Sequence, residues 1–319
     1  MATNLLKMKK IEFSPRRGTL FRVKGSKYSF EDLLGDGGHG KVYSAIMMND
    51  EGQEKKVAIK IENYDHLMLH TEVRVLRTAG RTGGKHFCEL IGHGIIPRTI
   101  SFMIMTLLGP DLHKLRHSME CKRFSLPTVL NIAEQTLEAI QELHALGIIS
   151  RDIKPGNFAP GHPENRQEQT IFIYDFGLSK KYVDKHDMLI APRSDIGWRG
   201  TDRYGSLVAH LRQDLSRRDD LESWFYMLVE ITQGSLPWRG FINREEVQKS
   251  KQAFRNRNRQ KYLSHCPQQF DEILKLIDGY SFSSIPDYHR IFNILKEIKR
   301  EAKIEDYPPF DWDLPSSSS

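Results

Sequence analysis

Two stretches decide the fold of this chain: Ser150-Arg151-Asp152-Ile153-Lys154-Pro155-Gly156-Asn157 and Asp175-Phe176-Gly177. The first contains a carboxylate that can take the proton of a substrate hydroxyl group and, five residues later, an amide that can hold a metal ion. The second contains another metal ligand. Either stretch alone could occur by chance, whereas the ordered pair rarely does. The pair predicts four site residues of a phosphoryl-transfer enzyme: the catalytic Asp152 and Lys154, and the metal ligands Asn157 and Asp175.

A glycine-rich stretch upstream has the spacing of a phosphate-binding loop. Leu34-Gly35-Asp36-Gly37-Gly38-His39-Gly40-Lys41-Val42 fits the pattern Gly-x-Gly-x-x-Gly-x-Val, whose glycines let the backbone approach phosphates. The same glycine spacing also opens dinucleotide-binding units, but those continue into a helix. Here Val57-Ala58-Ile59-Lys60 follows in an alternating, strand-like run. The stretch therefore predicts an ATP-binding loop, with Lys60 pairing the α- and β-phosphates.

The segment His66–Leu76 offers a partner for Lys60. Its apolar residues recur at the i, i+4, i+7 spacing of an amphipathic helix, and Glu72 lies on that helix. A single glutamate on such a helix is by default a surface residue. Because the other elements stand in the right order, we expect an ion pair between Lys60 and Glu72 and count both as catalytic residues.

From Tyr28 to about Lys303 the chain resembles the casein kinase 1 superfamily of Ser/Thr protein kinases. Segments outside the general kinase motifs carry this resemblance: Met105–Leu112 as the hinge, Thr201–Ser206 in place of the Ala-Pro-Glu motif, and Ser216–Ser223 with Gly234–Trp238 in the core of the large lobe. Phe225–Glu230 and Trp198–Thr201 are similar to the tau-tubulin kinase branch. The mixture resembles the divergent members of the superfamily that nematodes carry.

The resemblance implies an α+β, bilobal fold, with a small β-rich lobe that holds one helix and a larger α-helical lobe. It implies ATP and Mg²⁺ as cofactors, and Ser/Thr specificity from the lysine two places after Asp152. The ATP-binding residues that it implies are Leu34, Gly35, Gly37, Gly40, Val42, Ala58, Lys60, Met105, Thr106, Leu108 and Ala159. Asp220 is expected to anchor the backbone of the catalytic loop.

Three positions depart from the family pattern. Ser150 stands where a histidine usually precedes Arg-Asp, Gly156 replaces a more usual polar residue, and His39 replaces an aromatic residue at the tip of the glycine loop. None of these changes removes the base, the phosphate-pairing lysine or a metal ligand. We therefore expect an active kinase, and keep as the alternative a catalytically weak, nucleotide-binding pseudokinase scaffold.

The substrate is expected to be an acidic or phosphorylated protein. The resemblance implies that Arg203 helps to hold an anionic group near the phosphoacceptor, and the planar guanidinium suits a phosphate. The alternative is that Arg203 braces its own loop, where Asp202 could neutralise it. The net charge of +6 has its densest source in Lys249–Lys261, a run that is most often the solvated face of a helix. No aromatic-rich RNA-binding motif accompanies it, so nucleic acid is not the expected partner.

The domain prediction has three parts: a basic extension over residues 1–27, a kinase domain over 28–303 that divides at about 105/106, and a tail over 304–319. Three cysteines without Cys-x-x-Cys spacing indicate neither a disulfide framework nor a zinc site, and so a reducing compartment. No apolar run suggests a membrane span or a signal peptide. We expect the cytoplasm, with the nucleus also open, and a role in signal transduction.

Overall fold

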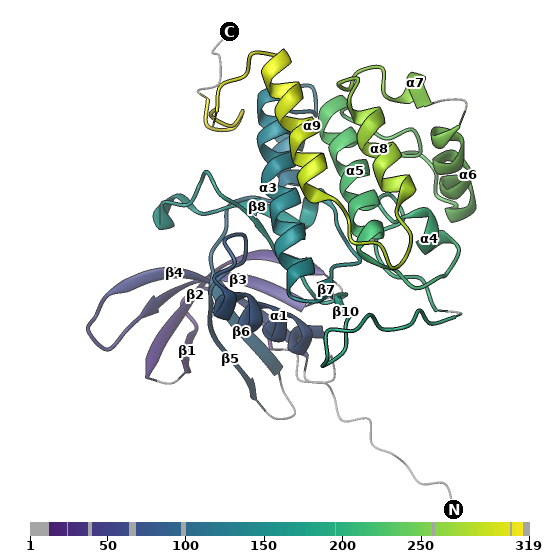
Figure 1. Ribbon diagram of the computed structural model, residues 1–319. Helices are drawn as coiled ribbons and strands as arrows, with labels where there is room; N and C mark the ends of the chain where they lie inside the picture. Colours follow the sequence, from purple (N-terminus) through teal and green to yellow (C-terminus); the bar gives the residue numbers. More distant parts are fainter. Residues whose placement is uncertain are drawn as a thin grey trace, which may run out of the picture. The chain divides into compact units, whose positions relative to one another are not determined.

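The computed structural model describes residues 13–23, 25–37, 40–63, 68–96, 100–194, 196–256, 259–306 and 308–314. They form two compact units: unit 1 spans Met1–Gly80 and Cys88–Leu107, and unit 2 spans Arg81–Phe87 and Leu108–Ser319. The strands of unit 1 and most helices of unit 2 are labelled in Figure 1. The predicted α+β class, with a β-rich and a helical part, is confirmed.

Unit 1 consists of an antiparallel sheet and one helix. The strand order is β1-β2-β3-β4-β6-β5. Its elements are β1 (Leu20–Val23), β2 (Ser26–Gly37), β3 (Gly40–Met48), β4 (Glu54–Asn63), α1 (Met68–Thr82), β5 (Leu90–Ile96) and β6 (Ile100–Thr106). The last two residues of α1 belong to unit 2. Valine and isoleucine dominate the middle of β4, and such β-branched residues favour a strand with both faces covered.

Aromatic side chains from several strands form the core of unit 1. The rings of Phe30 and Tyr43 meet edge to face at 5.4 Å, and Phe21 meets Phe102 in the same way at 4.9 Å. Phe21 lies on β1, which pairs with β2. Residues 1–27, predicted as a basic extension, thus include an edge strand of this sheet.

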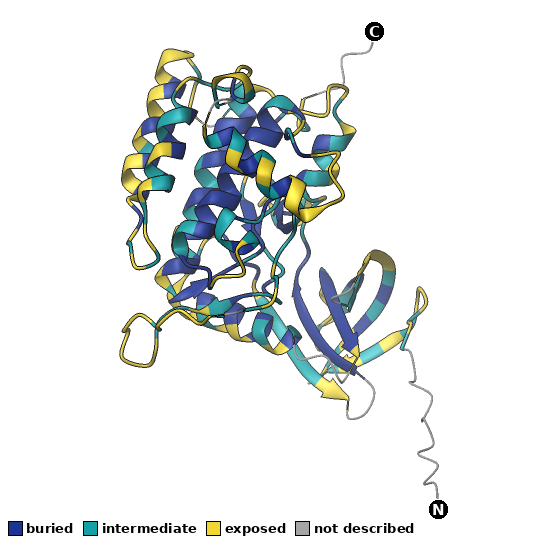
Figure 2. Cartoon of the chain, turned by 90° about the vertical axis from the view of Figure 1, so that its right-hand side faces the viewer, coloured by how far each residue is buried: buried dark blue, intermediate teal, exposed yellow. Residues whose placement is uncertain are grey.

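Unit 2 is mainly helical. Its helices are α2 (Leu112–Ser118), α3 (Leu126–Ala145), α4 (Leu207–His210), α5 (Arg217–Gln233), α6 (Arg244–Arg255), α7 (Arg259–Tyr262), α8 (Phe270–Gly279) and α9 (Tyr288–Glu301). Its short elements are β7 (Ile148–Ile149), η1 (Pro155–Asn157), β8 (Phe158–Pro160), η2 (Pro163–Asn165), β9 (Ile171–Ile173) and β10 (Lys180–Lys181). Figure 2 shows buried residues along the inner helices and exposed residues on the outer turns. None of the helices in the described ranges is both long and apolar enough to cross a membrane.

Local signals fix the ends of the two central helices. α3 has a proline in its first turn and is followed by Gly147 at φ 73°. α5 begins with a capping box, in which Ser216 and Asp219 satisfy each other's backbone N–H groups, and ends at Gly234 at φ 93°. Trp224 and Tyr226 on α5 are fully buried and belong to the core. These two helices carry the catalytic loop and its anchor.

Residues near the C-terminus complete the start of α3. Phe310 is fully buried, and the carboxylate of Asp311 accepts hydrogen bonds from the backbone N–H of Ser125 at 2.7 Å and from its hydroxyl at 2.5 Å. Ser125 is the N-cap residue of α3, but its own side chain makes no capping hydrogen bond. Asp311 therefore places a carboxylate at the N-terminus of α3, where negative charge is favourable. We call Phe310–Asp313 the C-terminal clip.

Candidate active site

The predicted ion pair in unit 1 is present. Lys60 on β4 places its Nζ 2.5 Å from Oε1 of Glu72 on α1, and their side chains are 6% and 2% exposed. Because the pair is buried, each charge depends strongly on its partner. The lysine is thereby held in one position on the sheet, as a residue that pairs with phosphates requires.

The glycine loop shows which glycines the fold itself needs. Gly37 pairs with Gly40 at the end of the β2–β3 hairpin; Gly38 and His39 lie outside the described residues. Gly40 has φ 99°, and a Cβ there would lie 2.3 Å from a backbone oxygen, so only glycine fits. A Cβ at Gly35 or Gly37 would meet nothing within 4 Å, and neither has a positive φ. Packing therefore does not require a glycine at either position. A glycine there does let a phosphate approach the backbone N–H groups closely.

The other predicted nucleotide residues of unit 1 follow the register of the sheet. Val42 on β3 pairs with Lys60, and Ala58 on β4 pairs with Met105 on β6. Thr106 ends β6, while Leu34 lies on β2 with an exposed side chain. The two remaining predicted residues belong to unit 2, where Ala159 lies on β8 and Leu108 forms a bridge with Gly161.

The catalytic loop of unit 2 holds Asp152 in a buried and specific position. Oδ2 of Asp152 lies 2.6 Å from Nζ of Lys154, and Oδ1 accepts a hydrogen bond of 2.8 Å from Oγ1 of Thr201. Lys154 also donates to Oγ1 of Thr201 at 3.3 Å. The carboxylate, the ammonium group and the hydroxyl thus form a closed triangle. The sequence did not single out Thr201 by itself, because its contact with Asp152 spans 49 residues.

The predicted metal ligands belong to the same unit. The side-chain amide nitrogen of Asn157 donates to the backbone oxygen and to Oδ2 of Asp152, so its amide oxygen is the atom that can serve a metal. Tyr174 donates its backbone N–H to the carbonyl of Asn157 at 3.0 Å, and Asp175 follows with φ 61°. An amide oxygen and a carboxylate are the hard ligands that Mg²⁺ takes. The residues present therefore fit this ion.

A buried carboxylate anchors the backbone of the catalytic loop, as predicted. Asp220 on α5 accepts hydrogen bonds from the backbone N–H groups of Ser150 at 2.7 Å and Arg151 at 2.8 Å. His144 at the end of α3 donates from Nε2 to the same carboxylate at 2.9 Å, and its Nδ1 lies 2.6 Å from the hydroxyl of Tyr288. Sequence reasoning missed His144. An imidazole thus still braces this loop through Asp220, although Ser150 occupies the position where one is usual.

Arg203 has a carboxylate partner within the protein. Its Nη1 lies 3.4 Å from Oε1 of the fully buried Glu230, which also contacts Arg116 and accepts a hydrogen bond from the hydroxyl of Tyr204. Asp202, the residue suggested to neutralise Arg203, instead accepts a hydrogen bond of 2.8 Å from Arg244. The structure thus gives Arg203 a bracing contact, while its side chain stays 31% exposed.

A cavity of about 640 Å³ opens beside the catalytic loop, and we call it the basic groove. It is lined by Asp111, His113, Lys114, Lys154, Gly156, Thr201, Asp202, Arg203, Tyr204, Trp238, Arg239, Phe241 and Val247, all in unit 2. Lys114 and Asp202 each have an ion-pair partner, whereas the exposed Arg239 has no acidic partner among the described residues. The groove therefore carries positive charge that no acidic residue of the described ranges neutralises.

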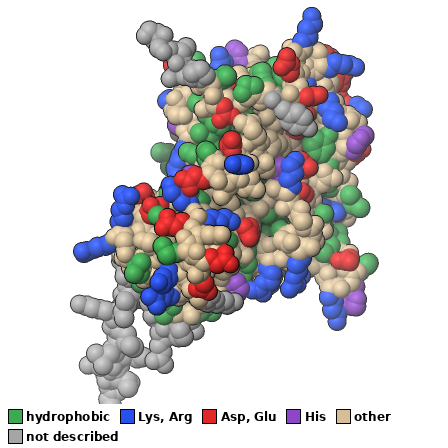
Figure 3. All heavy atoms as spheres, turned by 90° about the vertical axis from the view of Figure 1, so that its left-hand side faces the viewer, with side chains coloured by type: hydrophobic (Ala, Val, Ile, Leu, Met, Phe, Trp, Pro, Cys, Tyr) green, Lys and Arg blue, Asp and Glu red, His purple; other side chains and the backbone are tan. Residues whose placement is uncertain are grey.

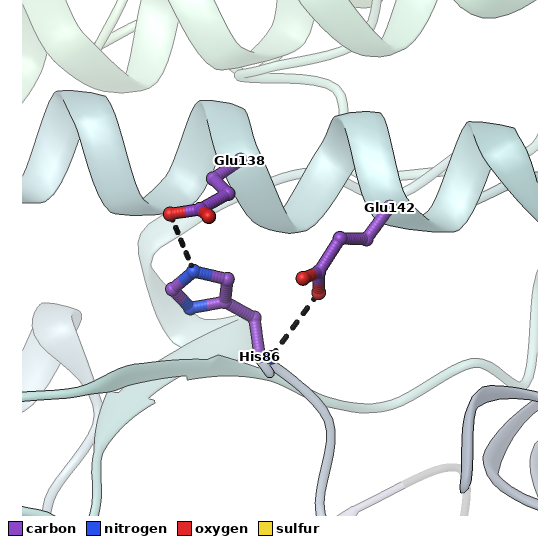
Figure 4. A group of neighbouring side chains, drawn as sticks. All are labelled: His86, Glu138 and Glu142. Carbon is purple, nitrogen blue, oxygen red and sulfur yellow. Dashed lines mark hydrogen bonds and ion pairs between the residues drawn. The ribbon is translucent and has the colours of Figure 1, made fainter. Parts of the chain in front are cut away.

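A histidine and two glutamates cluster on the same unit, in the segment before β5 and on α3 (Figure 4). His86 shares hydrogen bonds with the carbonyl of Ile171 at 2.6 Å and with Glu138 at 3.0 Å, while Glu142 accepts the backbone N–H groups of Lys85 and His86. Each ring nitrogen and both glutamates therefore already have protein partners. This cluster attaches the segment to β9, which leads to Asp175, so its role is structural.

Comparison with known proteins adds to this geometry. Residues 28–281 match the family model described as "Protein kinase domain". The chain is 35% identical over 308 residues to the serine/threonine-protein kinase spe-6 of Caenorhabditis elegans, a match that covers 93% of this chain and 79% of that protein. It is also 32% identical over 299 residues to a probable serine/threonine-protein kinase of Dictyostelium discoideum, which covers 93% of this chain and 58% of that one.

Proposed function

The chain belongs to the protein kinase family, and on that premise we propose that it transfers the γ-phosphoryl group of ATP to Ser/Thr hydroxyls of proteins, as a casein kinase 1-like enzyme. One observation carries the proposal: the carboxylate of Asp152 is fixed between Lys154 and Thr201 in a buried loop. A base that is held in this way can orient a hydroxyl group and take its proton.

The proposed roles follow from the contacts. Lys60, held by Glu72, pairs with phosphates of ATP, and Lys154 neutralises charge on the group in transfer. Asn157 and Asp175 would hold Mg²⁺, which when bound neutralises the phosphate oxygens. Thr201 orients both Asp152 and Lys154. Phosphoryl transfer has a loose transition state, so positioning and charge neutralisation are the main contributions that the protein makes.

The alternative is a pseudokinase scaffold, and Ser150 is the feature that favours it. The contacts of Asp220 count against it, since the backbone N–H of residue 150 makes the anchoring bond whatever its side chain. Transfer of labelled phosphate from Mg²⁺-ATP to casein separates the two. We expect incorporation that EDTA abolishes. Nucleotide binding without any incorporation would support the scaffold.

Substrates with acidic or phosphorylated residues fit the basic groove best. Figure 3 shows basic and acidic side chains interspersed on the face that it displays, so there the net charge is not gathered into the broad basic surface that nucleic acid prefers. In the groove, by contrast, Arg203 and Arg239 face a cavity next to Lys154. Arginine forks bind carboxylates and phosphates through two hydrogen bonds.

We expect Arg203→Gln to raise the KM for a phosphorylated peptide about tenfold, equivalent to about 1.4 kcal/mol, and to change that for a neutral peptide much less. Glutamine avoids placing a second carboxylate beside Glu230. Steady-state kinetics on the matched peptides measure this, with Arg239→Gln assayed in parallel. Equal losses on both peptides would mean that Arg203 only braces its loop through Glu230, and a selective loss only in Arg239→Gln would move the anion contact to Arg239.

Activity should not require phosphorylation of the activation segment, Gly177–Thr201. A buried carboxylate already orders it, since Asp214 lies 2.6 Å from Nζ of Lys180 and 3.2 Å from Nε of Arg193. Burial favours the neutral form, but the hydrogen bonds from Arg193 and Lys180 lower the pKa of Asp214 to about 2, so it stays charged at working pH. The Asp214 carboxylate thus orders the activation segment, as a bound phosphate group does in other kinases.

Phosphatase-treated protein should therefore keep its activity, whereas Asp214→Asn should lose most of it. Mass spectrometry before the assay confirms the phosphorylation state. Loss of activity on dephosphorylation, with recovery on rephosphorylating Ser194, would contradict this expectation.

A further inference from the structure

A lysine occupies a buried position on α6, where an apolar residue would be usual. Val247, Lys251 and Phe254 form the buried stripe of this helix, and Lys251 is 0% exposed. The interpretation of the run Lys249–Lys261 as a solvated helix face is therefore wrong for Lys251. It is also wrong for Arg255, which pairs with a buried glutamate of α5. Burying an ammonium group is costly, and burial lowers the pKa of Lys251 to about 7, so the contacts of the charged form must compensate.

The ammonium group of Lys251 uses its three donors on three acceptors. It donates to the backbone oxygen of Asp202 at 2.8 Å and to that of Gly205 at 2.5 Å, and it lies 3.2 Å from Nε2 of His210. Burial lowers the pKa of His210 to about 4, so this imidazole is neutral at pH 7 and can accept the bond. The rings of Tyr226 and Trp238 lie 5.0 and 5.4 Å from Nζ, within cation–π range.

These contacts hold the segment Thr201–Gly205. Within the same segment, the carbonyl of Arg203 accepts a hydrogen bond of 2.7 Å from Nε1 of Trp238. The N–H groups of Tyr204 and Gly205 both donate to the carbonyl of Thr201. The segment is therefore fixed by buried side chains of α6 and of the loop that follows α5.

Thr201 connects this segment to the catalytic loop. Its hydroxyl donates to Asp152 at 2.8 Å and accepts from Lys154 at 3.3 Å. A shift of the Asp202–Gly205 backbone would move this hydroxyl and the groove wall formed by Arg203 and Tyr204. Displacements of about 1 Å in such positions can lower rates about a hundredfold.

We propose that Lys251 is a positioning residue for the protein substrate: its ammonium group fixes the Thr201–Gly205 segment, and thereby the wall of the basic groove and the hydroxyl that orients Asp152. The inference rests on the proposed kinase function. Lys251 touches neither Asp152 nor Lys154 and acts through the backbone. It therefore governs peptide binding and turnover. Its contacts are with Asp202, Gly205, His210, Tyr226 and Trp238, none of which is a predicted ATP-binding residue.

Two variants and a control test this role. Lys251→Met keeps the length and apolar stem but removes all three donors, whereas Lys251→Arg keeps a charged donor. Lys296→Met removes an exposed lysine from α9 and serves as the matched control. We expect Lys251→Met to raise the peptide KM about tenfold and to change the ATP KM less than about twofold. Lys251→Arg should recover most of this loss, and Lys296→Met should behave as the unaltered protein.

Hydrogen exchange of the Tyr204 and Gly205 amides gives a readout independent of activity. Their exchange should become faster in Lys251→Met and stay slow in Lys251→Arg. Unchanged exchange, or equal changes in the peptide and ATP KM values, would overturn the proposal. If the unaltered protein transfers no phosphate, the proposed function fails, but exchange still decides whether Lys251 holds the segment. If Lys251→Met does not fold, Lys251→Gln replaces it. Its amide nitrogen lies one bond closer to the backbone than Nζ of a lysine, so its two donors reach less far, and changes in the same direction but of smaller size are expected.

Discussion

Asp152→Asn should abolish phosphoryl transfer while ATP binding stays nearly intact. The amide cannot take a proton from the substrate hydroxyl. Its NH₂ group would also replace one of the two oxygens that now accept from Lys154 and Thr201, and would face a cation or a donor there. Loss of a general base that acts in the transition state lowers turnover by about a hundredfold or more. Casein phosphorylation measures the loss, and calorimetric titration with Mg²⁺-ATP measures binding.

A matched control is Asp306→Asn, which makes the same chemical change at an exposed position. This variant should retain full activity. If Asp152→Asn kept full activity, or if it lost nucleotide binding together with transfer, the role of Asp152 as the base would be wrong.

Lys60→Met should lower turnover by a similar factor, of about a hundredfold, and should also destabilise unit 1. The buried Glu72 carboxylate would lose its cation partner at 2.5 Å, and breaking a buried pair from one side typically costs about 3–5 kcal/mol. Denaturant unfolding measures the second effect. The double variant Lys60→Met, Glu72→Gln should regain most of the stability and none of the activity.

This combination separates catalysis from folding. Lys55→Met on the same strand removes an exposed ion pair with Glu89, which typically contributes less than about 1 kcal/mol, and should leave activity unchanged. Recovery of activity in the double variant would show that Lys60 has only a structural role.

The parts of the site that the sequence predicted depend on spacing along the chain. The Lys60–Glu72 pair follows from motif order and helical periodicity, whereas the anchoring by Asp220 follows from the family resemblance; both contacts are confirmed. The α+β class follows from the same resemblance and is also confirmed.

What the sequence did not predict depends on contacts between distant residues. Arg203 could be neutralised by its neighbour Asp202, but the fold pairs it with Glu230 and pairs Asp202 with Arg244. Lys251 looked like one cation of a solvated run, yet α6 turns it inward. The sequence shows how many charged side chains a segment has, whereas tertiary packing decides which of them are buried and which partner each one has.

The C-terminal clip has a consequence for synthesis on the ribosome. The described strands and helix of unit 1 are complete once residue 107 has emerged, so this sheet can form while translation continues. The large helical unit must wait, because α3 receives the Asp311 carboxylate 186 residues after Ser125. Until then the start of α3 and the site for Phe310 remain uncovered, and the nascent helical unit is the part of this chain that most needs protection from aggregation.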